Sequence, residues 1–122
     1  MIKEAYVSFE IAKLLKEKGF NEPCRAVYEE EILRINTLCD YYNSELSSYV
    51  CAPTHQMAMK WLRKKGIYIY IQPTKYVGGA LYGFQSIIED GRNDDWKRHI
   101  HHEDNYEEAV EAALKYCLEN LI

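Results

Sequence analysis

Residues 52–72, APTHQMAMKWLRKKGIYIYIQ, contain a complete helix, a helix stop and a strand in direct succession. Thr54 is a favoured N-cap residue, and apolar side chains then recur at helical spacing as far as Leu62. Gly66 stands where a helix needs a left-handed residue in order to end. The residues that follow, IYIYI at 67–71, alternate branched aliphatic and aromatic side chains, which is typical of a strand. The segment therefore predicts a helix packed against a sheet in the middle of the chain.

Two further helices are predicted, one on each side of this segment. The first runs from Ser8 as its cap to about Lys18 and ends at Gly19, which repeats the stop seen at Gly66. The last begins at Asn105, with Glu108 three positions later as in a capping box. Its apolar stripe consists of Tyr106, Ala109, Val110, Ala113, Leu114, Cys117, Leu118 and Leu121.

Four more strands complete the predicted fold, and hairpin connections make the sheet mostly antiparallel. They cover residues 24–28, 30–40, 80–89 and 96–102, with 41–48 as an exposed loop. The pattern of 30–40 also fits a helix, but 29–31 suits the loop of a hairpin. We therefore expect an α+β fold, in which a five-stranded sheet packs with three helices in the order α-β-β-α-β-β-β-α. Residues 1–122 form a single α+β sandwich domain in this prediction.

Composition excludes several classes of protein. The 28% of charged residues argues against disorder, and the net charge of -4 disfavours a protein that mainly grips duplex phosphates. The first ten residues lack a secretory pattern, and no run approaches the roughly 20 apolar residues that span a bilayer. The four cysteines include no C-x-x-C pair, so we expect reduced thiols in a cytoplasmic protein that has no membrane contact.

Three segments carry a resemblance to known sequences. YVSFEIAKLLKEKGF, APTHQMAMKWLRKK and YEEAVEAALKYCLENLI resemble parts of small uncharacterised proteins encoded by phages and mobile elements of Bacteroides-type gut bacteria. The layout is also loosely similar to helix-sheet-helix sandwich domains of phage proteins. The resemblance implies a cytoplasmic accessory protein of phage or mobile-element origin and supplies no catalytic residue. It does not extend to residues 29–50.

A metal site is the sharpest catalytic candidate. His99, His101 and Glu103 alternate along a predicted strand, so they project from one face. Two imidazoles and a carboxylate suit zinc or iron. A polar outer face on an edge strand explains the same residues without a metal, and no second motif supplies orienting partners. We expect no bound metal and no cofactor.

A thiol nucleophile is the second catalytic candidate, because Cys51 lies four residues before His55. Cysteine is more often a buried and inert core residue, which is also the interpretation for Cys117 on the last helix. The chain contains no G-x-S-x-G, P-loop or H-E-x-x-H pattern. We therefore predict a non-enzymatic protein with no catalytic residue.

Nucleic-acid binding is the alternative function. A basic cluster precedes Tyr68 and Tyr70, and it consists of Lys60, Arg63, Lys64 and Lys65. Cations can hold phosphates, and aromatic side chains beside them can stack bases. A helix carboxyl end neutralised by cations, followed by a half-buried sheet, explains the same residues, and the acidic net charge favours that explanation.

Self-association is the preferred prediction. Tyr68 and Tyr70 are expected on the sheet face opposite to the isoleucines, with Tyr82 and Phe84 of the next strand beside them. Such an aromatic patch needs a cover. The last helix is one cover, and a second copy of the chain across a two-fold axis is the other. We expect an interaction protein that forms a homodimer, with Tyr70 at or beside the interface.

Overall fold

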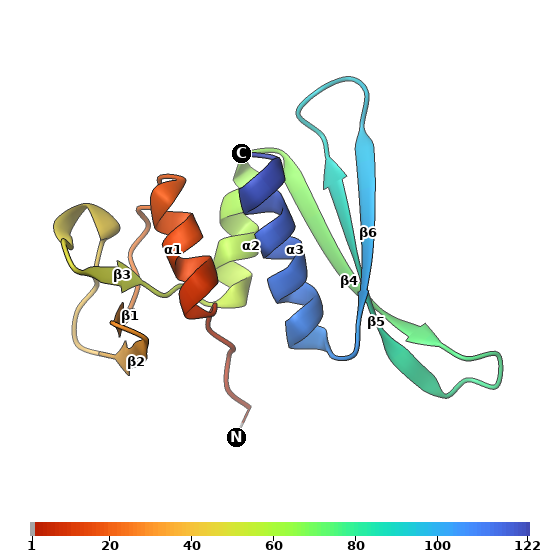
Figure 1. Cartoon of the computed structure of the whole chain (residues 1–122), viewed down its shortest axis with the longest axis horizontal. Coiled ribbons are helices and arrows are strands. Elements are labelled where there is room, and N and C mark those ends of the chain that lie inside the picture. Colours follow the sequence, from red (N-terminus) through yellow and green to blue (C-terminus); the bar gives the residue numbers. More distant parts are fainter. Residues whose placement is uncertain (1) are drawn as a thin grey trace.

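The computed structural model describes residues 2–122, which form a layer of three helices between two small antiparallel sheets (Figure 1). The helices are α1 (Phe9–Glu17), α2 (His55–Lys64) and α3 (Tyr106–Asn120). The first sheet has the order β2-β1-β3 and the second has the order β4-β5-β6. The strands are β1 (Ala26–Glu29), β2 (Ile32–Ile35), β3 (Tyr49–Cys51), β4 (Ile67–Lys75), β5 (Leu81–Asp90) and β6 (Lys97–Glu103), and a short 3-10 turn, η1, covers Asn43–Glu45.

The prediction of one five-stranded sheet, with the order α-β-β-α-β-β-β-α, is wrong. The observed order is α-β-β-β-α-β-β-β-α, and the six strands form two separate sheets. The predicted order lacks β3, whose three residues follow the polar segment 41–48 and carry too little pattern to mark a strand. β3 pairs with β1 and leads directly into α2. As part of the helical layer, α2 connects the first sheet to β4 of the second sheet.

The predicted helix ends are confirmed. Ser8, Thr54 and Asn105 each accept a hydrogen bond from a backbone N–H in the first turn of the helix that follows. Gly19 and Gly66 have φ values of 92° and 91°, so both occupy the left-handed region that favours glycine. The ends of α1 and α2 are therefore fixed by local sequence.

The core lies among the three helices and reaches both sheets. Leu15 of α1, Leu62 of α2 and Leu114 of α3 are fully buried. Ile67 of β4 and Ile88 of β5 pack against them in the same cluster. Both sheets and all three helices contribute side chains to this cluster, so the helical layer holds the two sheets together.

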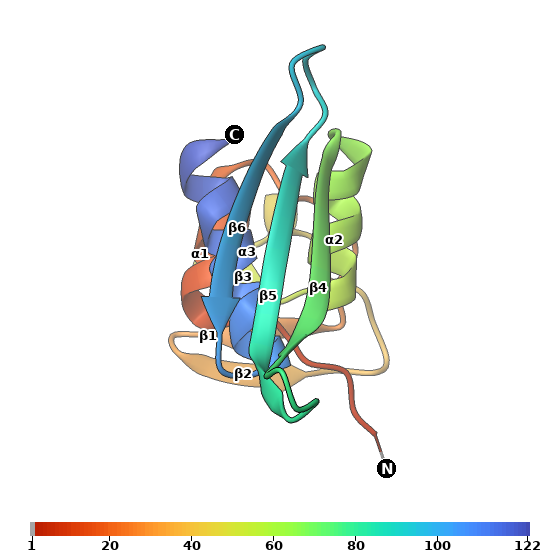
Figure 2. The ribbon, with the colours of Figure 1, turned by 90° about the vertical axis from the view of Figure 1, so that its right-hand side faces the viewer.

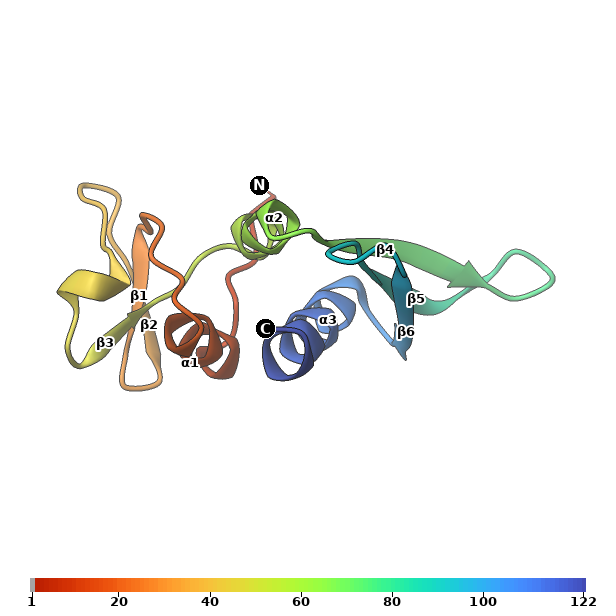
Figure 3. The same cartoon turned by 90° about the horizontal axis from the view of Figure 1, so that it is seen from above.

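The second sheet presents one face to the helices and leaves the other open (Figures 2 and 3). Ile67, Ile69 and Ile71 face the helices, whereas Tyr68 and Tyr70 face away from them, as predicted. None of the helices formed by residues 2–122 covers the face of this sheet that carries Tyr68 and Tyr70. The alternative in which the last helix covers the tyrosines is therefore wrong, since α3 packs on the isoleucine side.

No helix within residues 2–122 has the length and apolar character needed to cross a membrane.

Candidate interaction surface

The open face of the second sheet, called the outer face below, is built from three cross-strand rows. Antiparallel pairing places partners on the same face, so the register defines the rows directly. They are Tyr68-Glu89-Arg98, Tyr70-Ile87-Ile100 and Gln72-Gln85-His102. The middle row carries no charge and consists of one aromatic and two aliphatic side chains. Within each of the two flanking rows, polar groups pair with each other: Gln72 with Gln85, and Arg98 with Glu89.

Side chains of the middle row and one end of the outer face remain exposed to solvent. Tyr70 and Ile100 each retain 51% of their accessible surface, and Trp96 retains 57%. The Trp96 ring stacks on Tyr68, with ring centroids 5.8 Å apart and planes 8° from parallel. A Cβ on Gly91 would lie 2.7 Å from the Trp96 ring, so only glycine leaves room for this stack.

The charges beside this row are neutralised within the sheet. Arg98 donates two hydrogen bonds to Glu89, the shorter at 2.6 Å. An Arg–Glu pair that satisfies itself leaves little unpaired charge on the outer face. The face therefore presents an aromatic and aliphatic row rather than a charged one.

The outer face continues towards the β4–β5 turn through three rings in contact. Tyr82 packs on His102 at 4.6 Å and on Tyr76 at 4.9 Å between ring centroids. His102 in turn covers Gly83, whose added Cβ would lie 2.8 Å from the imidazole. Phe84 does not join them, because it pairs with Pro73 on the helix side and packs against Tyr106 of α3.

The predicted basic cluster is not brought together with the tyrosines. Lys60 and Lys64 of α2 flank a hollow of about 180 Å³ whose floor includes Trp61 and Pro23. α2 lies on the helix side of β4, whereas Tyr68 and Tyr70 point to the opposite side. Arg63 is exposed on the same helix. The cations of α2 and the two tyrosines, which the sequence combined into one site for nucleic acid, therefore lie on opposite sides of β4.

Two of the three histidines of β6 point towards α3. His99 and His101 lie on the helix-facing side, where Tyr116 of α3 packs between them, 4.6 and 5.0 Å from the two rings. The Tyr116 hydroxyl lies 2.9 Å from His99 Nδ1. Glu103 shares this face but pairs in register with Phe84, near the beginning of α3. Across residues 2–122, no group of three His, Cys, Asp or Glu side chains is arranged to hold a metal ion.

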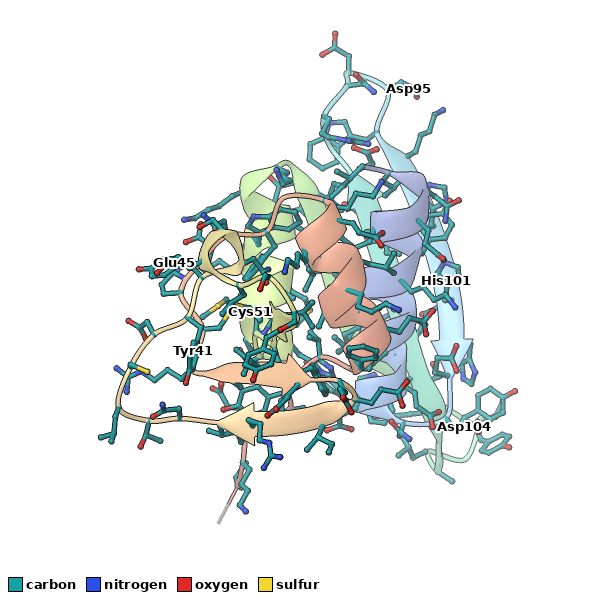
Figure 4. All side chains as sticks on the ribbon, turned by 60° about the vertical axis from the view of Figure 1, so that its left-hand side comes forward. Tyr41, Glu45, Cys51, Asp95, His101 and Asp104 are labelled. Carbon is teal, nitrogen blue, oxygen red and sulfur yellow. The ribbon has the colours of Figure 1, made fainter. Side chains whose placement is uncertain are left out.

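Three of the four thiols, those of Cys24, Cys51 and Cys117, are buried, whereas Cys39 is exposed. Cys51 is fully buried between the first sheet and the helices (Figure 4), where its thiol neighbours that of Cys24, and His55 is hydrogen-bonded to Glu111 instead. The neighbouring Cys51 thiol, together with burial, raises the pKa of the Cys24 thiol far above its usual range. Burial raises the pKa of Cys117 to about 12. These environments favour the protonated form of Cys24 and Cys117, which is the unreactive one.

One polar cluster has no local signal in the sequence. His55 donates a 2.8 Å hydrogen bond to Glu111, which lies 56 positions away and also accepts one from the Ser8 backbone N–H. Glu107 and Glu108 line the same open groove of about 490 Å³. His55 is buried and Glu111 ties α3 to the beginnings of α1 and α2, so this cluster has a structural role.

Comparison with known proteins returns no relative. No family model, curated protein or solved structure matches the chain. The function is therefore inferred from the side chains of this chain alone.

Proposed function

We propose that this protein is a non-enzymatic interaction module that pairs with a second copy of itself through the outer face. The observation that carries the proposal is the apolar middle row, Tyr70-Ile87-Ile100, on a sheet face without a helical cover. Large apolar patches rimmed by polar residues are uncommon on monomers and mark interaction surfaces. A phage or mobile-element origin is a separate proposal, which rests only on the resemblance of the three sequence segments.

The polar frame of the row also suits an interface. Gln72 donates to Gln85 at 2.9 Å on one side, and the Arg98–Glu89 pair closes the other. Interfaces commonly combine an apolar centre that contains tyrosine or tryptophan with a polar rim. A two-fold axis through such a face places each middle row on its counterpart without bringing unpaired like charges together.

Light scattering of the purified protein at micromolar concentration tests the proposal. A mass near twice 14.4 kDa is expected for the natural chain. Ile100→Asp is expected to weaken association by about tenfold or more, because it buries a charge at the centre of the interface. Tyr70→Ser is expected to act in the same direction.

Ile35→Asp is the matched control. Ile35 lies on the edge strand of the first sheet and retains 55% of its surface, much like Ile100 on the edge strand of the second. It should leave the mass unchanged. A monomeric mass for the natural chain, with Tyr70→Ser altering only stability, would show that the tyrosines serve the fold alone.

A further inference from the structure

The β4–β5 hairpin extends beyond the body of the protein as a two-stranded arm. β6 ends opposite Phe84, so the pairs Thr74–Gly83 and Lys75–Leu81 and the turn beyond them lack a third strand. Residues 74–83, which are called the arm below, project past the helices in Figures 1 and 3. A two-stranded ribbon has little stability of its own in water.

The arm bends towards the side of the outer face. The register shifts between Thr74 and Lys75, which leaves Tyr82 as an extra residue on β5. An extra residue of this kind bends the strand that carries it. The ribbon consequently leaves the plane of the sheet on the side away from the helices, so the arm and the outer face enclose an angle (Figures 1 and 3).

The arm is apolar in a protein that is otherwise rich in charge. The segment from Ile67 to Ile88 contains one charged residue, Lys75, whereas 28% of the residues in the whole chain are charged. Val77 is fully exposed, and Tyr76, Leu81 and Tyr82 each retain more than half of their surface. An arm that contacted only water would be expected to carry more polar side chains, because exposed apolar clusters are unfavourable in water.

The size of the surface favours a role for the arm in association. Tyr70, Ile100 and Trp96 each expose about half of the roughly 200 Å² of a large side chain, so together they offer about 300 Å². A standard interface buries about 800 Å² on each partner. The four exposed side chains of the arm add about 500 Å², which brings the continuous surface to that size.

We infer that the arm clasps a second copy of this chain, so that each protomer of the dimer lays its arm on its partner. This inference rests on the proposed function and names the part of the chain that completes the interface. A second copy is the occupant that fits best, because it supplies the same uncharged aromatic surface twice. The bend places each arm beside whatever docks on the outer face. Reciprocal arms then raise the apolar area that each protomer can bury from about 300 to about 800 Å².

Val77→Asp in the full chain tests the inference by sedimentation equilibrium. The side chain is fully exposed, so the melting temperature extrapolated to low concentration should stay unchanged. The dissociation constant of the dimer is expected to rise about tenfold or more, since a charge must be buried against the partner. Replacement of residues 76–80 by Asn-Gly, which shortens the turn, should weaken the dimer in the same way.

Leu38→Asp is the matched control, because Leu38 is almost fully exposed in the loop that follows β2. It should leave the dissociation constant unchanged. Hydrogen exchange gives an independent measurement: amides of the arm should become protected as the protein concentration passes the dissociation constant.

The outcomes separate the two proposals. A dimer whose dissociation constant stays within twofold for both arm variants would overturn the clasp while leaving the self-association intact. A natural chain that is monomeric throughout would overturn both. A monomer that sediments with vesicles of phosphatidylcholine, and loses that property in Val77→Asp, would show that a bilayer occupies the arm and would also overturn the clasp.

Discussion

The two sheets flank the same helical layer but are stabilised in different ways. Strands of the first sheet contain three or four residues, and side chains from the neighbouring segments hold them in place. Lys16, for example, donates to the backbone carbonyls of Leu46 and Tyr49. Strands of the second sheet contain seven to ten residues and rely on their own ladders and on α3. A sheet of the second kind does not need both of its faces for packing within the same chain.

Exposed apolar residues show the same contrast. Ile32 and Ile35 of the first sheet are both exposed, but they are three positions apart and therefore lie on opposite faces of β2. Tyr70, Ile87 and Ile100 of the second sheet are direct partners on one face. Register, rather than the number of apolar residues, thus separates scattered exposure from a surface that can bind.

The largest expected effect lies beside the first sheet, at Asn43 of η1. This buried side chain donates to the Phe20 carbonyl and accepts from the Cys51 N–H, both at 2.9 Å. Asn43→Ala leaves two buried backbone groups unpaired and should destabilise the protein by about 3 kcal/mol. Urea denaturation followed by circular dichroism measures this loss.

Asn21→Ala supplies the comparison, because Asn21 accepts from the Ser44 N–H at the same distance but is exposed. It should cost about 0.5–1 kcal/mol, since water replaces the lost partner. Equal losses at the two sites would show that buried side-chain hydrogen bonds do not hold the first sheet.

The next effect concerns the passage from α2 into the second sheet. Gly66 has a φ of 91°, and a Cβ there would lie 3.2 Å from Arg92 Cγ. Gly66→Val should destabilise the protein by about 2 kcal/mol, because a branched residue is strained in that conformation. Thermal unfolding measures the effect. Gly78→Val, in the open turn of the arm, should change stability much less, and a similar loss there would contradict this explanation.

The helical layer between the sheets provides a pH-dependent effect. Burial raises the pKa of the Glu111 carboxyl, but hydrogen bonds from His55 and Ser8 outweigh it and bring the pKa below its usual value of 4.5. A carboxyl with a lowered folded-state pKa stabilises the protein above the unfolded pKa, and this contribution disappears as the pH falls through the folded value. Glu111→Gln should cost about 1–2 kcal/mol at pH 7.

Urea titrations at pH 7 and pH 3 check this prediction. The difference between the natural chain and Glu111→Gln should shrink at pH 3, because the stability that a lowered carboxyl pKa contributes is lost as the pH falls below the unfolded value of 4.5. A difference that stays constant between the two pH values would show that the charge of Glu111 contributes nothing to stability.

Local features could be predicted from the sequence, and long-range ones could not. The helix caps at Ser8 and Thr54 and the helix stop at Gly66 depend on neighbours within four residues. The local sequence was therefore sufficient to predict these helix ends. Alternation also assigned Tyr68 and Tyr70 to the face opposite the isoleucines. The division into two sheets depends on which strands pair with one another on each side of the helical layer, and no local pattern encodes that choice.

The candidate surface was predicted in part for the same reason. Tyr82 and Phe84 are two positions apart and were expected on one face, but the extra residue near Lys75 disrupts the alternation, and they pack on different sides. A bulge depends on pairing with another strand, so the single strand gives no sign of it. The His55–Glu111 contact joins residues 56 positions apart and is likewise invisible in any short window.

The smallest expected effect lies inside the second sheet and has the opposite sign. Ser86 pairs with Ile71 and His101 on the helix-facing side and is fully buried, yet its hydroxyl has no hydrogen-bond partner among residues 2–122. Removal of an unpaired buried hydroxyl relieves its desolvation, so Ser86→Ala should leave stability unchanged or raise it by up to about 1 kcal/mol.

The same substitution at Ser8 should cost about 1 kcal/mol, because the Ser8 hydroxyl accepts from the Ile11 N–H and caps α1. Thermal unfolding of both variants against the natural chain compares a serine that forms a hydrogen bond with one that forms none. A loss at Ser86 equal to the loss at Ser8 would show that the Ser86 hydroxyl is satisfied in solution. In that case the second sheet, like the first, would depend on side-chain hydrogen bonds as well as on its ladders.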